Sequence, residues 1–359
     1  MKETVTAVIG CGAISDIYLT NLTTRFSGIR VKYCCAAHFE NAQKKALQYG
    51  LTPATYDRIL GDREVELVVV LTPAPSHYEL IKQALLAGKH VYTEKTMTVD
   101  PAQARELVDL AQGKGLYLGA APDTFLGAAL QKAGEVLQSG TIGQVTGFNV
   151  YVNRSLDRMT CLYPFLRLPG GGICYDYGVY HITALAYLLG PVKEVFGIVE
   201  NRKSLRTGTV EGTADFGKTY AYENEAQVTA ILRMESGVTG TLTLNGESIP
   251  QDLRHFRIYG EFGVLELPDP NGFGGDVALV RSRTDRQVLE NDLPYMDNSR
   301  GLGVWDMCRA METGGEHRAN SRLALHVLEV IHAIMESGRR GERVTCSNGY
   351  FVPNTAPHH

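Results

Sequence analysis

The stretch GGGICYDYGVYHITAL, residues 170–185, begins with three consecutive glycines and then carries an aspartate, tyrosines and a histidine. Asp176, Tyr180 and His181 have side chains of the types that transfer protons in proteins. The glycines predict a loop, and the residues after them predict a helix near 178–189. This segment is therefore a candidate proton-transfer site, and each of the three side chains is a candidate for that role.

A second group of candidates lies in AVIGCGAIS, residues 7–15. Gly10 and Gly12 stand between a predicted strand and a predicted helix and match the first two glycines of the dinucleotide fingerprint, with Ser15 in place of the third. These glycines permit a tight turn and close approach of the backbone to a pyrophosphate. Gly10, Gly12, Ala13 and Ile14 are candidate cofactor-binding residues, and a purely structural turn is the alternative.

The end of the second predicted strand bears on the choice of cofactor, because an acidic residue there binds the ribose hydroxyls of NAD. The sequence CCAAHFEN places Ala36, Ala37 and His38 at this point, with neither a carboxylate nor an arginine. His38, helped by Lys44 or Lys45, could hold a 2′-phosphate, or it could be a solvated loop residue. We expect NAD or NADP as the cofactor, with a slight preference for NADP.

A third group lies in LTPAPSHYELIKQALLAGKHVYTEKTMT, residues 71–98. Lys95 ends a predicted strand at the carboxyl edge of the sheet, where open α/β sheets bind ligands. A solvated surface lysine is the alternative.

These three segments, together with two later stretches, resemble the Gfo/Idh/MocA oxidoreductase family, named for glucose-fructose oxidoreductase and inositol dehydrogenase. The resemblance covers nearly the whole chain and rests on GCGAIS, TPAPSHYELIKQALLAGKHVYTEK, GGGICYDYGVYHITALAYLLGPV, PDPNGFGG and NSRGLGVWDM. It implies a Rossmann domain, then an α/β domain with a large open sheet that often forms dimer or tetramer interfaces. It also implies hydride transfer between a nicotinamide and a sugar, polyol or related hydroxyl.

The resemblance also implies roles for single residues. Lys95 corresponds to the lysine of the family's EKP motif, beside substrate and nicotinamide, with Thr96 in place of the proline. In the motif Asp-x-Gly-x-His, whose histidine is the usual acid/base, Asp176 matches the aspartate and Tyr180 takes the histidine position, as in glucose-fructose oxidoreductase. His181 comes one residue later, a rotation of about 100° on a helix. The register therefore favours Tyr180 over His181 as the acid/base.

A phenol is a poor base at pH 7, because its free pKa is about 10. A neighbouring ammonium stabilises phenolate, so Lys95 is expected to assist Tyr180 while Asp176 orients the lysine or holds a substrate hydroxyl. The alternatives are a packed aromatic for Tyr180, a core or interface histidine for His181, and a cap of the following helix for Asp176.

Further candidates flank these segments. On the cofactor side they are Thr72, Pro73, His77 and Glu94, with a helix-start role as the alternative for His77. On the substrate side they are Asp123 with its neighbour Thr124, Tyr163 and Arg167, together with Arg154 and Arg158. No metal site is expected, since the histidines near the end of the chain share no metal spacing.

The elements that must position these groups follow from periodicity. Apolar runs alternate with helical segments over residues 4–121, which predicts a parallel sheet covered by helices. Its strands are predicted in TVTAVIG, VKYCCAA, VELVVVLT, KHVYTEK and GLYLGAA, and its helices start near Ala13, Glu40, Ser76 and Pro101. Later runs alternate residue by residue, as in an antiparallel sheet with one covered face, among helices predicted at 125–138, 303–312 and 321–338.

The predicted fold is therefore an N-terminal doubly wound parallel Rossmann sheet, residues 1–122, followed by a C-terminal α/β domain with a large, mostly antiparallel open sheet, residues 123–359. The tail after Ser347 is predicted to be loose.

Composition narrows the function. The chain has 359 residues, 44% of them hydrophobic and 21% charged, with a formal net charge of −4. Charges of both signs are interspersed, which argues against nucleic-acid or membrane partners and favours a small carbohydrate-like substrate. No run is long enough to span a membrane, and the first residues enter a strand pattern without a signal-peptide core, so we expect a cytoplasmic protein. The seven cysteines are expected to be reduced and mostly buried.

The leading hypothesis is an NAD(P)-dependent oxidoreductase acting on a sugar, glycoside or cyclitol, as a homodimer or homotetramer. The first alternative is a glycosidase that uses tightly held NAD for transient oxidation at C3 and elimination. The second is a non-catalytic dinucleotide-binding sensor, for which mutation of Lys95 would be silent.

Overall fold

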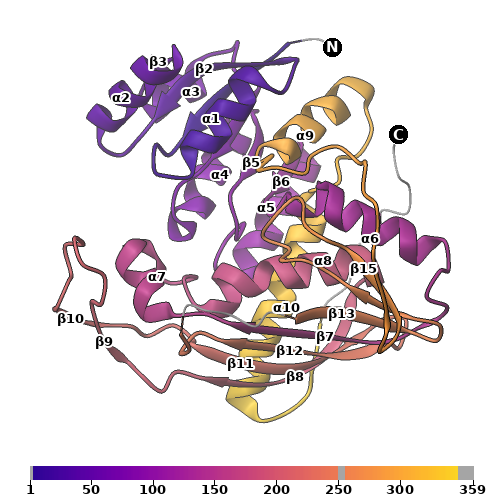
Figure 1. The fold of residues 1–359 in the computed structure, drawn as a ribbon. Coiled ribbons are helices and arrows are strands. Elements are labelled where there is room, and N and C mark those ends of the chain that lie inside the picture. Colours follow the sequence, from indigo (N-terminus) through magenta and orange to yellow (C-terminus); the bar gives the residue numbers. More distant parts are fainter. Residues whose placement is uncertain (1–2, 250–254, 347–359) are drawn as a thin grey trace. The chain divides into compact units, whose positions relative to one another are not determined.

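The computed structural model describes residues 3–249 and 255–346 of the chain (Figure 1). They form two compact units. Unit 1 comprises Met1–Leu126 and Asn298–Leu325, and unit 2 comprises Gly127–Asp297 and His326–His359. The sequence analysis put residues 298–325 in the second domain, whereas their contacts join them to unit 1. The predicted loose tail lies outside the described residues.

Unit 1 contains a parallel sheet of six strands in the order β3-β2-β1-β4-β5-β6, the strand order of a Rossmann fold. The strands are β1 (Thr4–Ile9), β2 (Ile29–Cys35), β3 (Thr52–Pro53), β4 (Leu67–Val70), β5 (His90–Thr93) and β6 (Leu118–Ala120). All residues of β4 are 0% exposed, as its apolar character on both faces predicts. The predicted Rossmann sheet is thus confirmed, and only β3 was not predicted.

The helices of unit 1 are α1 (Ser15–Thr24), α2 (Phe39–Tyr49), α3 (Tyr56–Gly61), α4 (His77–Leu86), α5 (Pro101–Gly113) and α9 (Leu302–Thr313), with short 3₁₀ turns η1 (Ala74–Ser76) and η2 (Thr124–Leu126). The side chain of Asp100 caps α5 by accepting a hydrogen bond from Ala102 N at 2.8 Å, and Pro101 is the first helical residue.

Unit 2 is built on a sheet of nine strands in the order β16-β15-β14-β13-β7-β12-β11-β8-β17. Among the strand pairs that the described residues form in this sheet, only β7–β12 is parallel, so the prediction of a large, mostly antiparallel sheet is confirmed. The strands are β7 (Val145–Asn153), β8 (Val192–Glu200), β11 (Gln227–Met234), β12 (Thr239–Asn245), β13 (His255–Gly260), β14 (Val264–Glu266), β15 (Ala278–Ser282), β16 (Asp285–Val288) and β17 (Val344–Thr345). A separate pair joins β9 (Leu205–Thr207) to β10 (Thr219–Ala221).

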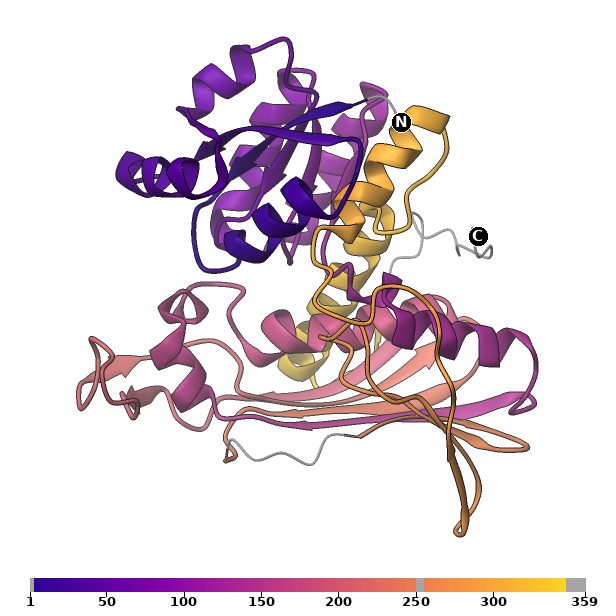
Figure 2. The same cartoon turned by 45° about the horizontal axis from the view of Figure 1, so that its top comes forward.

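Helices α6 (Ala128–Gln138) and α8 (Val179–Leu189) lie on one face of this sheet (Figure 2). Gln131 Nε2 of α6 donates to the hydroxyl of Tyr187 of α8 at 2.9 Å. Helix α10 (Ser321–Arg340) packs against β8, where Gly197 N donates to Ser337 Oγ at 2.9 Å. The remaining short helices of the unit are α7 (Leu156–Leu162), η3 (Pro164–Arg167) and a π-helical turn η4 (Cys174–Gly178) that leads into α8.

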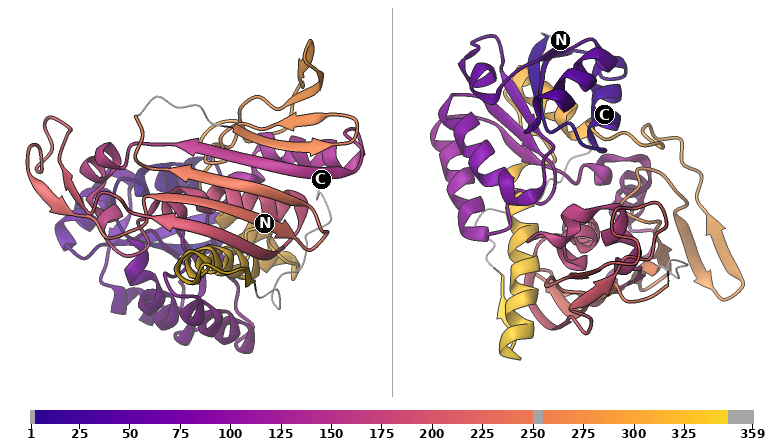
Figure 3. Two further views of the ribbon diagram at one scale, coloured as in Figure 1. Left: turned by 90° about the horizontal axis from the view of Figure 1, so that it is seen from below. Right: turned by 90° about the vertical axis from the view of Figure 1, so that its left-hand side faces the viewer.

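The opposite face of the large sheet has its strands in view when the molecule is seen from below (Figure 3, left). Residues of β11 alternate between buried and exposed, as the sequence pattern predicts for a sheet covered on one face. The exposed side chains on this face include Phe196, Ile198 and Ile231.

None of the helices within the described part of the chain is both long and apolar enough to cross a membrane. All seven cysteines are free thiols, and all except Cys11 are buried.

Candidate functional site

The loop between β1 and α1 has the geometry that a dinucleotide requires. Gly10 has φ 106°, and a β-carbon there would lie 2.7 Å from the carbonyl carbon of Leu71, so only glycine fits. A β-carbon on Gly12 would meet no protein atom within 4 Å. Ser15 Oγ donates to Gly12 O at 2.6 Å and holds the loop against the start of α1. The loop therefore leaves its open side at a helix N-terminus, where a pyrophosphate binds favourably.

The residues after β2 differ in how free they are to bind a phosphate. His38 is exposed and its side chain makes no capping hydrogen bond to α2. Lys45, by contrast, is paired with the carboxylate of Asp16 on α1, which is also bonded to the hydroxyl of Tyr49. Lys45 is thus a less favourable partner for a 2′-phosphate than its spacing in the sequence indicates, because its charge is already neutralised.

His77 joins the loops that follow β4 and β5. It is 0% exposed and is the first residue of α4; its Nδ1 lies 2.8 Å from Thr96 O and its Nε2 lies 2.7 Å from Thr72 O. Both ring nitrogens are therefore occupied by backbone carbonyls. This arrangement favours the alternative of a helix-start residue over direct contact with a cofactor.

The lysine candidate sits immediately after β5. Lys95 is partly exposed among buried neighbours, and its peptide bond to Thr96 is cis. The adjoining Glu94 is 9% exposed, and its carboxylate accepts hydrogen bonds from the hydroxyl of Tyr18 at 2.7 Å and from Lys95 N at 3.1 Å. Glu94 is thus held by unit 1 itself, while Lys95 lies at the carboxyl edge of the parallel sheet.

Asp123 has a structural role in unit 1. It is 1% exposed, and its Oδ2 accepts hydrogen bonds from Gly301 N and Gly303 N, each at 3.0 Å, at the start of α9. Burial raises the pKa of Asp123 to about 6. The neighbouring Thr124 is 2% exposed. These contacts give no support to the hypothesis that Asp123 touches substrate.

Asp176 lies in unit 2, in the π-helical turn before α8. It is not the cap of that helix: the N-cap residue is Gly178, and the helix has no side-chain cap, so this alternative is wrong. Arg154 Nη1 lies 3.9 Å from Asp176 Oδ2, and the guanidinium of Arg154 lies 4.0 Å from the ring centroid of Tyr177. The Tyr177 hydroxyl donates to Asp269 Oδ2 at 2.5 Å. Asp176 is therefore part of a charged cluster rather than a helix cap.

Tyr180 and His181 both lie on the first turn of α8. Tyr180 is 8% exposed, and its ring centroid lies 6.1 Å from that of Tyr177. His181 is 2% exposed and lies 5.8 Å from the ring centroid of Phe256 on β13, with Nδ1 3.4 Å from Tyr177 O. The imidazole therefore packs toward the sheet, as a core histidine does.

The flanking residues Arg167 and Tyr163 have different surroundings. Arg167 donates to Thr160 O at 2.8 Å, pairs with Asp215 at 2.7 Å and lies 3.6 Å from the ring centroid of Tyr220. Tyr163 is 41% exposed. The arginine thus fastens η3 to the β10 region, which uses much of its hydrogen-bonding capacity within unit 2.

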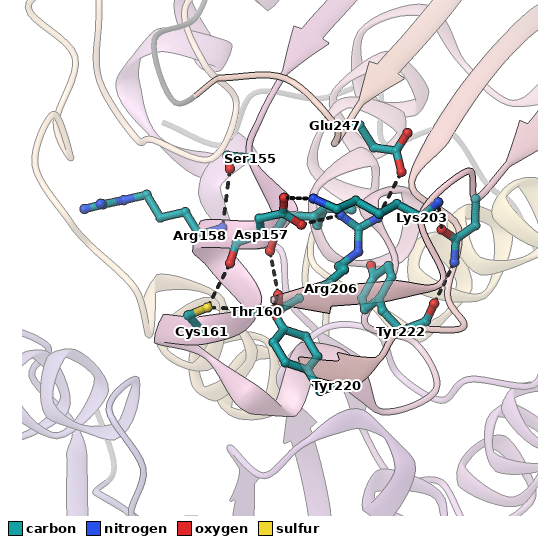
Figure 4. Close-up of polar contacts among 12 residues, drawn as sticks. Ser155, Asp157, Arg158, Thr160, Cys161, Lys203, Arg206, Tyr220, Tyr222 and Glu247 are labelled. Carbon is teal, nitrogen blue, oxygen red and sulfur yellow. Dashed lines mark hydrogen bonds and ion pairs between the residues drawn. The ribbon is translucent and has the colours of Figure 1, made fainter. Parts of the chain in front are cut away.

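An ion network surrounds the buried Arg206 (Figure 4). Arg206 is 1% exposed and donates to Asp157 Oδ1 at 2.8 Å and Glu247 Oε1 at 3.1 Å; Lys203 also pairs with Asp157. The guanidinium lies 4.6 Å from the ring centroid of Tyr222. This network ties α7 to β9, while the exposed side chain of Arg158 points away from it (Figure 4).

The sequence analysis missed Asp269 and Glu225 as parts of this region. Asp269 lies in the quoted motif PDPNGFGG. It could have been noticed there, because the aspartate is the one ionisable side chain in that motif. Glu225 stands just before β11 with no local signal of its own. In the described ranges 3–249 and 255–346, no group of three His, Cys, Asp or Glu side chains could hold a metal ion.

Comparison with known proteins supports this description. Residues 5–121 match a family model described as an oxidoreductase family with an NAD-binding Rossmann fold, and residues 130–266 match the GFO/IDH/MocA C-terminal domain. The dTDP-3,4-didehydro-2,6-dideoxy-alpha-D-glucose 3-reductase of Actinomadura kijaniata is 29% identical over 86% of this chain and 94% of its own length. The D-xylose 1-dehydrogenase (NADP(+)) of Hypocrea jecorina is 27% identical over 70% of this chain and 65% of its own length.

Two further facts complete the comparison. The matched part of the chain spans less than two thirds of other curated relatives, 58% of one and 59% of another. The aldose-aldose oxidoreductase of Caulobacter crescentus, solved with glycerol, has the same fold, with a TM-score of 0.80 and 22% identity over 96% of this chain and 100% of that chain. Because the two family models together cover most of the sequence, the chain belongs to the Gfo/Idh/MocA oxidoreductase family.

Proposed function

We propose that the chain is an NAD(P)-dependent oxidoreductase that transfers hydride between a nicotinamide and a hydroxyl or carbonyl of a sugar, glycoside or cyclitol. The observation that carries this proposal is that unit 1 combines an open glycine loop at a helix N-terminus with a lysine at the carboxyl edge of the same parallel sheet. The first feature suits a dinucleotide and the second suits a polar substrate.

The residues proposed to hold the dinucleotide are Gly10, Gly12, Ala13 and Ile14 at the pyrophosphate, Thr72, Pro73 and Glu94 toward the nicotinamide, and His38 at the adenosine ribose. A nicotinamide held by these residues would supply the acceptor or donor of the hydride. The exposed imidazole of His38, with no carboxylate beside it in sequence, favours NADP slightly over NAD. His77 acts in this proposal through the loops that it joins.

Tyr180 is proposed as the acid/base. In the oxidative direction a hydride leaves the carbinol carbon, the hydroxyl proton passes to the phenolate of Tyr180, and a carbonyl results; reduction reverses both transfers. The ammonium of Lys95 would stabilise the phenolate, and Asp176 would orient that lysine or accept a hydrogen bond from a substrate hydroxyl. Tyr163 remains a candidate substrate contact, and a homodimer or homotetramer remains the predicted assembly.

Tyr180→Phe tests the proposal. The variant keeps the ring but has no proton to exchange, so kcat should fall about 10²- to 10⁴-fold, while the Kd of the nucleotide stays within about twofold. Turnover is followed at the NAD(P)H absorbance band, with the nucleotide identified after denaturing the purified protein.

Tyr187→Phe is the matched control, because it removes a phenol hydroxyl from the same helix, one that bonds to Gln131. Near-normal turnover of Tyr180→Phe would eliminate the acid/base role. Release of an aglycone without added cofactor would instead favour the glycosidase alternative.

A further inference from the structure

The carboxylate of Glu225 closes the loop that carries the three glycines. Its Oε1 accepts hydrogen bonds from Cys174 N at 3.0 Å and from Tyr175 N at 3.4 Å, the first residues of the π-helical turn. A β-carbon on Gly172 would lie 1.9 Å from Glu225 Oε2. Any side chain at residue 172 would therefore displace this carboxylate.

The backbone holds the same contact from both sides. Ile173 N donates to Glu225 O at 3.1 Å, and Asp176 N donates to Gly172 O at 2.8 Å. Through these bonds the position of Asp176 depends on the loop that Glu225 secures. The following residue, Ala226, donates to Glu200 O at 2.9 Å and so anchors Glu225 to the edge of the β8–β11 pair.

Two neighbours of Glu225 fasten the preceding part of the loop. Tyr222 donates its hydroxyl to Gly171 O at 3.3 Å, and Asn224 Nδ2 donates to Leu168 O at 2.8 Å. Tyr222 is fully buried beside Arg206 (Figure 4). The ion pairs of Arg206 with Asp157 and Glu247 fix the position of this guanidinium. A β-carbon on Gly171 would lie 2.2 Å from Leu166 O, so this glycine also permits a close backbone approach.

A carboxylate that accepts N–H groups at the beginning of a helical segment supplies what a capping side chain supplies elsewhere. Helix α8 has no side-chain cap of its own, and its preceding π-helical turn receives this carboxylate from a residue about 50 positions later in the chain.

We propose that Glu225 is a positioning residue for the reaction: by bonding Cys174 N and Tyr175 N and filling the space over Gly172, it fixes the turn that presents Asp176 and leads to Tyr180. The inference rests on the proposed function for its effect on turnover, but its effect on the turn stands on the geometry of unit 2 alone. Glu225 itself touches neither substrate nor cofactor in this account.

The test compares Glu225→Asp, Glu225→Ala and Glu225→Gln, with Glu223→Gln as the matched control on an exposed carboxylate two residues away. Asp keeps the charge but withdraws it by about one methylene, and Ala removes the acceptor. We expect both to lower kcat about tenfold or more, with the KM of the nucleotide within about twofold. Glu225→Gln should retain kcat within about threefold, because its amide oxygen still accepts the two N–H bonds.

Amide hydrogen exchange over residues 173–179, read by mass spectrometry in the intact chain, is the second measurement. Exchange should accelerate in the Asp and Ala variants and remain close to the unchanged protein in the Gln and control variants. If Glu225→Ala fails to fold, Glu225→Asp decides alone. Wild-type kcat and wild-type exchange in Glu225→Asp would overturn the inference.

The two proposals can fail separately. If the unchanged protein turns over no carbohydrate with either nucleotide, the proposed function fails. Amide hydrogen exchange alone then tests the positioning role of Glu225. Faster exchange in Glu225→Asp that is absent from Glu225→Gln would then support the positioning role in the fold. Equal exchange in all variants would overturn it.

Discussion

At the scale of single residues, His77 shows how one buried side chain serves two loops. Its ring nitrogens lie within 2.8 Å of the carbonyl oxygens of Thr72 and Thr96, yet a neutral imidazole has only one N–H to donate. Burial lowers the pKa of His77, while the two carbonyls and Glu94 oppose that shift. The ring therefore holds the residues that follow β4 and β5 in a fixed relation, including the loop of Lys95.

His77→Ala should lower both stability and turnover. The substitution removes the buried imidazole and the one hydrogen bond that its neutral form donates to a carbonyl oxygen, which should reduce the free energy of unfolding by about 2 kcal/mol or more. Loosening of the Lys95 loop should lower kcat in addition. Urea unfolding and steady-state kinetics measure the two effects. The control is His38→Ala, an exposed residue whose removal should change stability by less than about 0.5 kcal/mol. Equal stability of the two variants would contradict this role.

At the scale of elements, local patterns predicted the parts that depend on local physics. The strand predicted in VELVVVLT, which contains β4, and the helix predicted to start near Pro101, α5, are confirmed. The strand β3 was missed because two residues carry no periodicity. Segment 298–325 joins unit 1 through bonds such as Gly301 N to Asp123, 178 positions apart, and the contact of Glu225 with Cys174 joins residues 51 positions apart. Such pairings depend on tertiary structure, which no local pattern encodes.

Substitutions at two glycines of the β1–α1 loop should affect stability and nucleotide binding differently. Gly10→Ala requires a β-carbon 2.7 Å from the Leu71 carbonyl carbon at φ 106°, so it should destabilise the protein by about 1 to 3 kcal/mol. Gly12→Ala adds a methyl group to open space, so stability should change by less than about 1 kcal/mol. It should nevertheless weaken nucleotide binding about tenfold or more, because in the proposed complex the methyl would take space assigned to the pyrophosphate.

Thermal unfolding and nucleotide titration monitored by fluorescence distinguish these effects. Gly12→Ala serves as the control for Gly10→Ala, since both replace a glycine in the same loop. Normal nucleotide affinity in Gly12→Ala would contradict the proposal that the pyrophosphate binds at this loop.

At the scale of the whole molecule, the candidate groups are divided between the two compact units. Unit 1 carries the glycine loop and Lys95, and unit 2 carries Asp176 and Tyr180. The titrating groups are divided as well. Burial lowers the pKa of His317 in unit 1 to about 4, whereas burial raises the pKa of Glu225 in unit 2 to about 7. Their contributions to stability therefore change with pH in opposite directions.

The contribution of Glu225 can be isolated as a difference between two proteins. Its pKa is raised above the ordinary 4.5 by burial and by repulsion from Asp176, against the lowering effect of the N–H groups of Cys174 and Tyr175. Burial, and after it the charge of the same carboxylate, raises the pKa values of the Cys174 thiol and of the Tyr222 phenol, and the charge of Arg206 opposes the shift of Tyr222. A folded state with a raised carboxyl pKa binds its proton more tightly than the unfolded chain does. The stabilisation from this group is therefore complete below about pH 4.5 and is lost as the pH rises through about 7.

Glu225→Gln has no proton to lose, so its stability should not show this part of the pH dependence. Between pH 4.5 and 8 the free energy of unfolding of the unchanged protein should fall relative to that of the variant by at most about 3 kcal/mol. Urea unfolding of both proteins across this range gives the difference directly. The histidines and Asp123 contribute equally to both proteins and cancel. Glu223→Gln keeps Glu225 and its raised pKa, so its free energy of unfolding should change with pH as that of the unchanged protein does. A difference in free energy of unfolding that stays constant with pH would contradict this prediction. It would mean that the Glu225 carboxyl of the folded protein is already ionised at pH 4.5, so that its pKa is not raised.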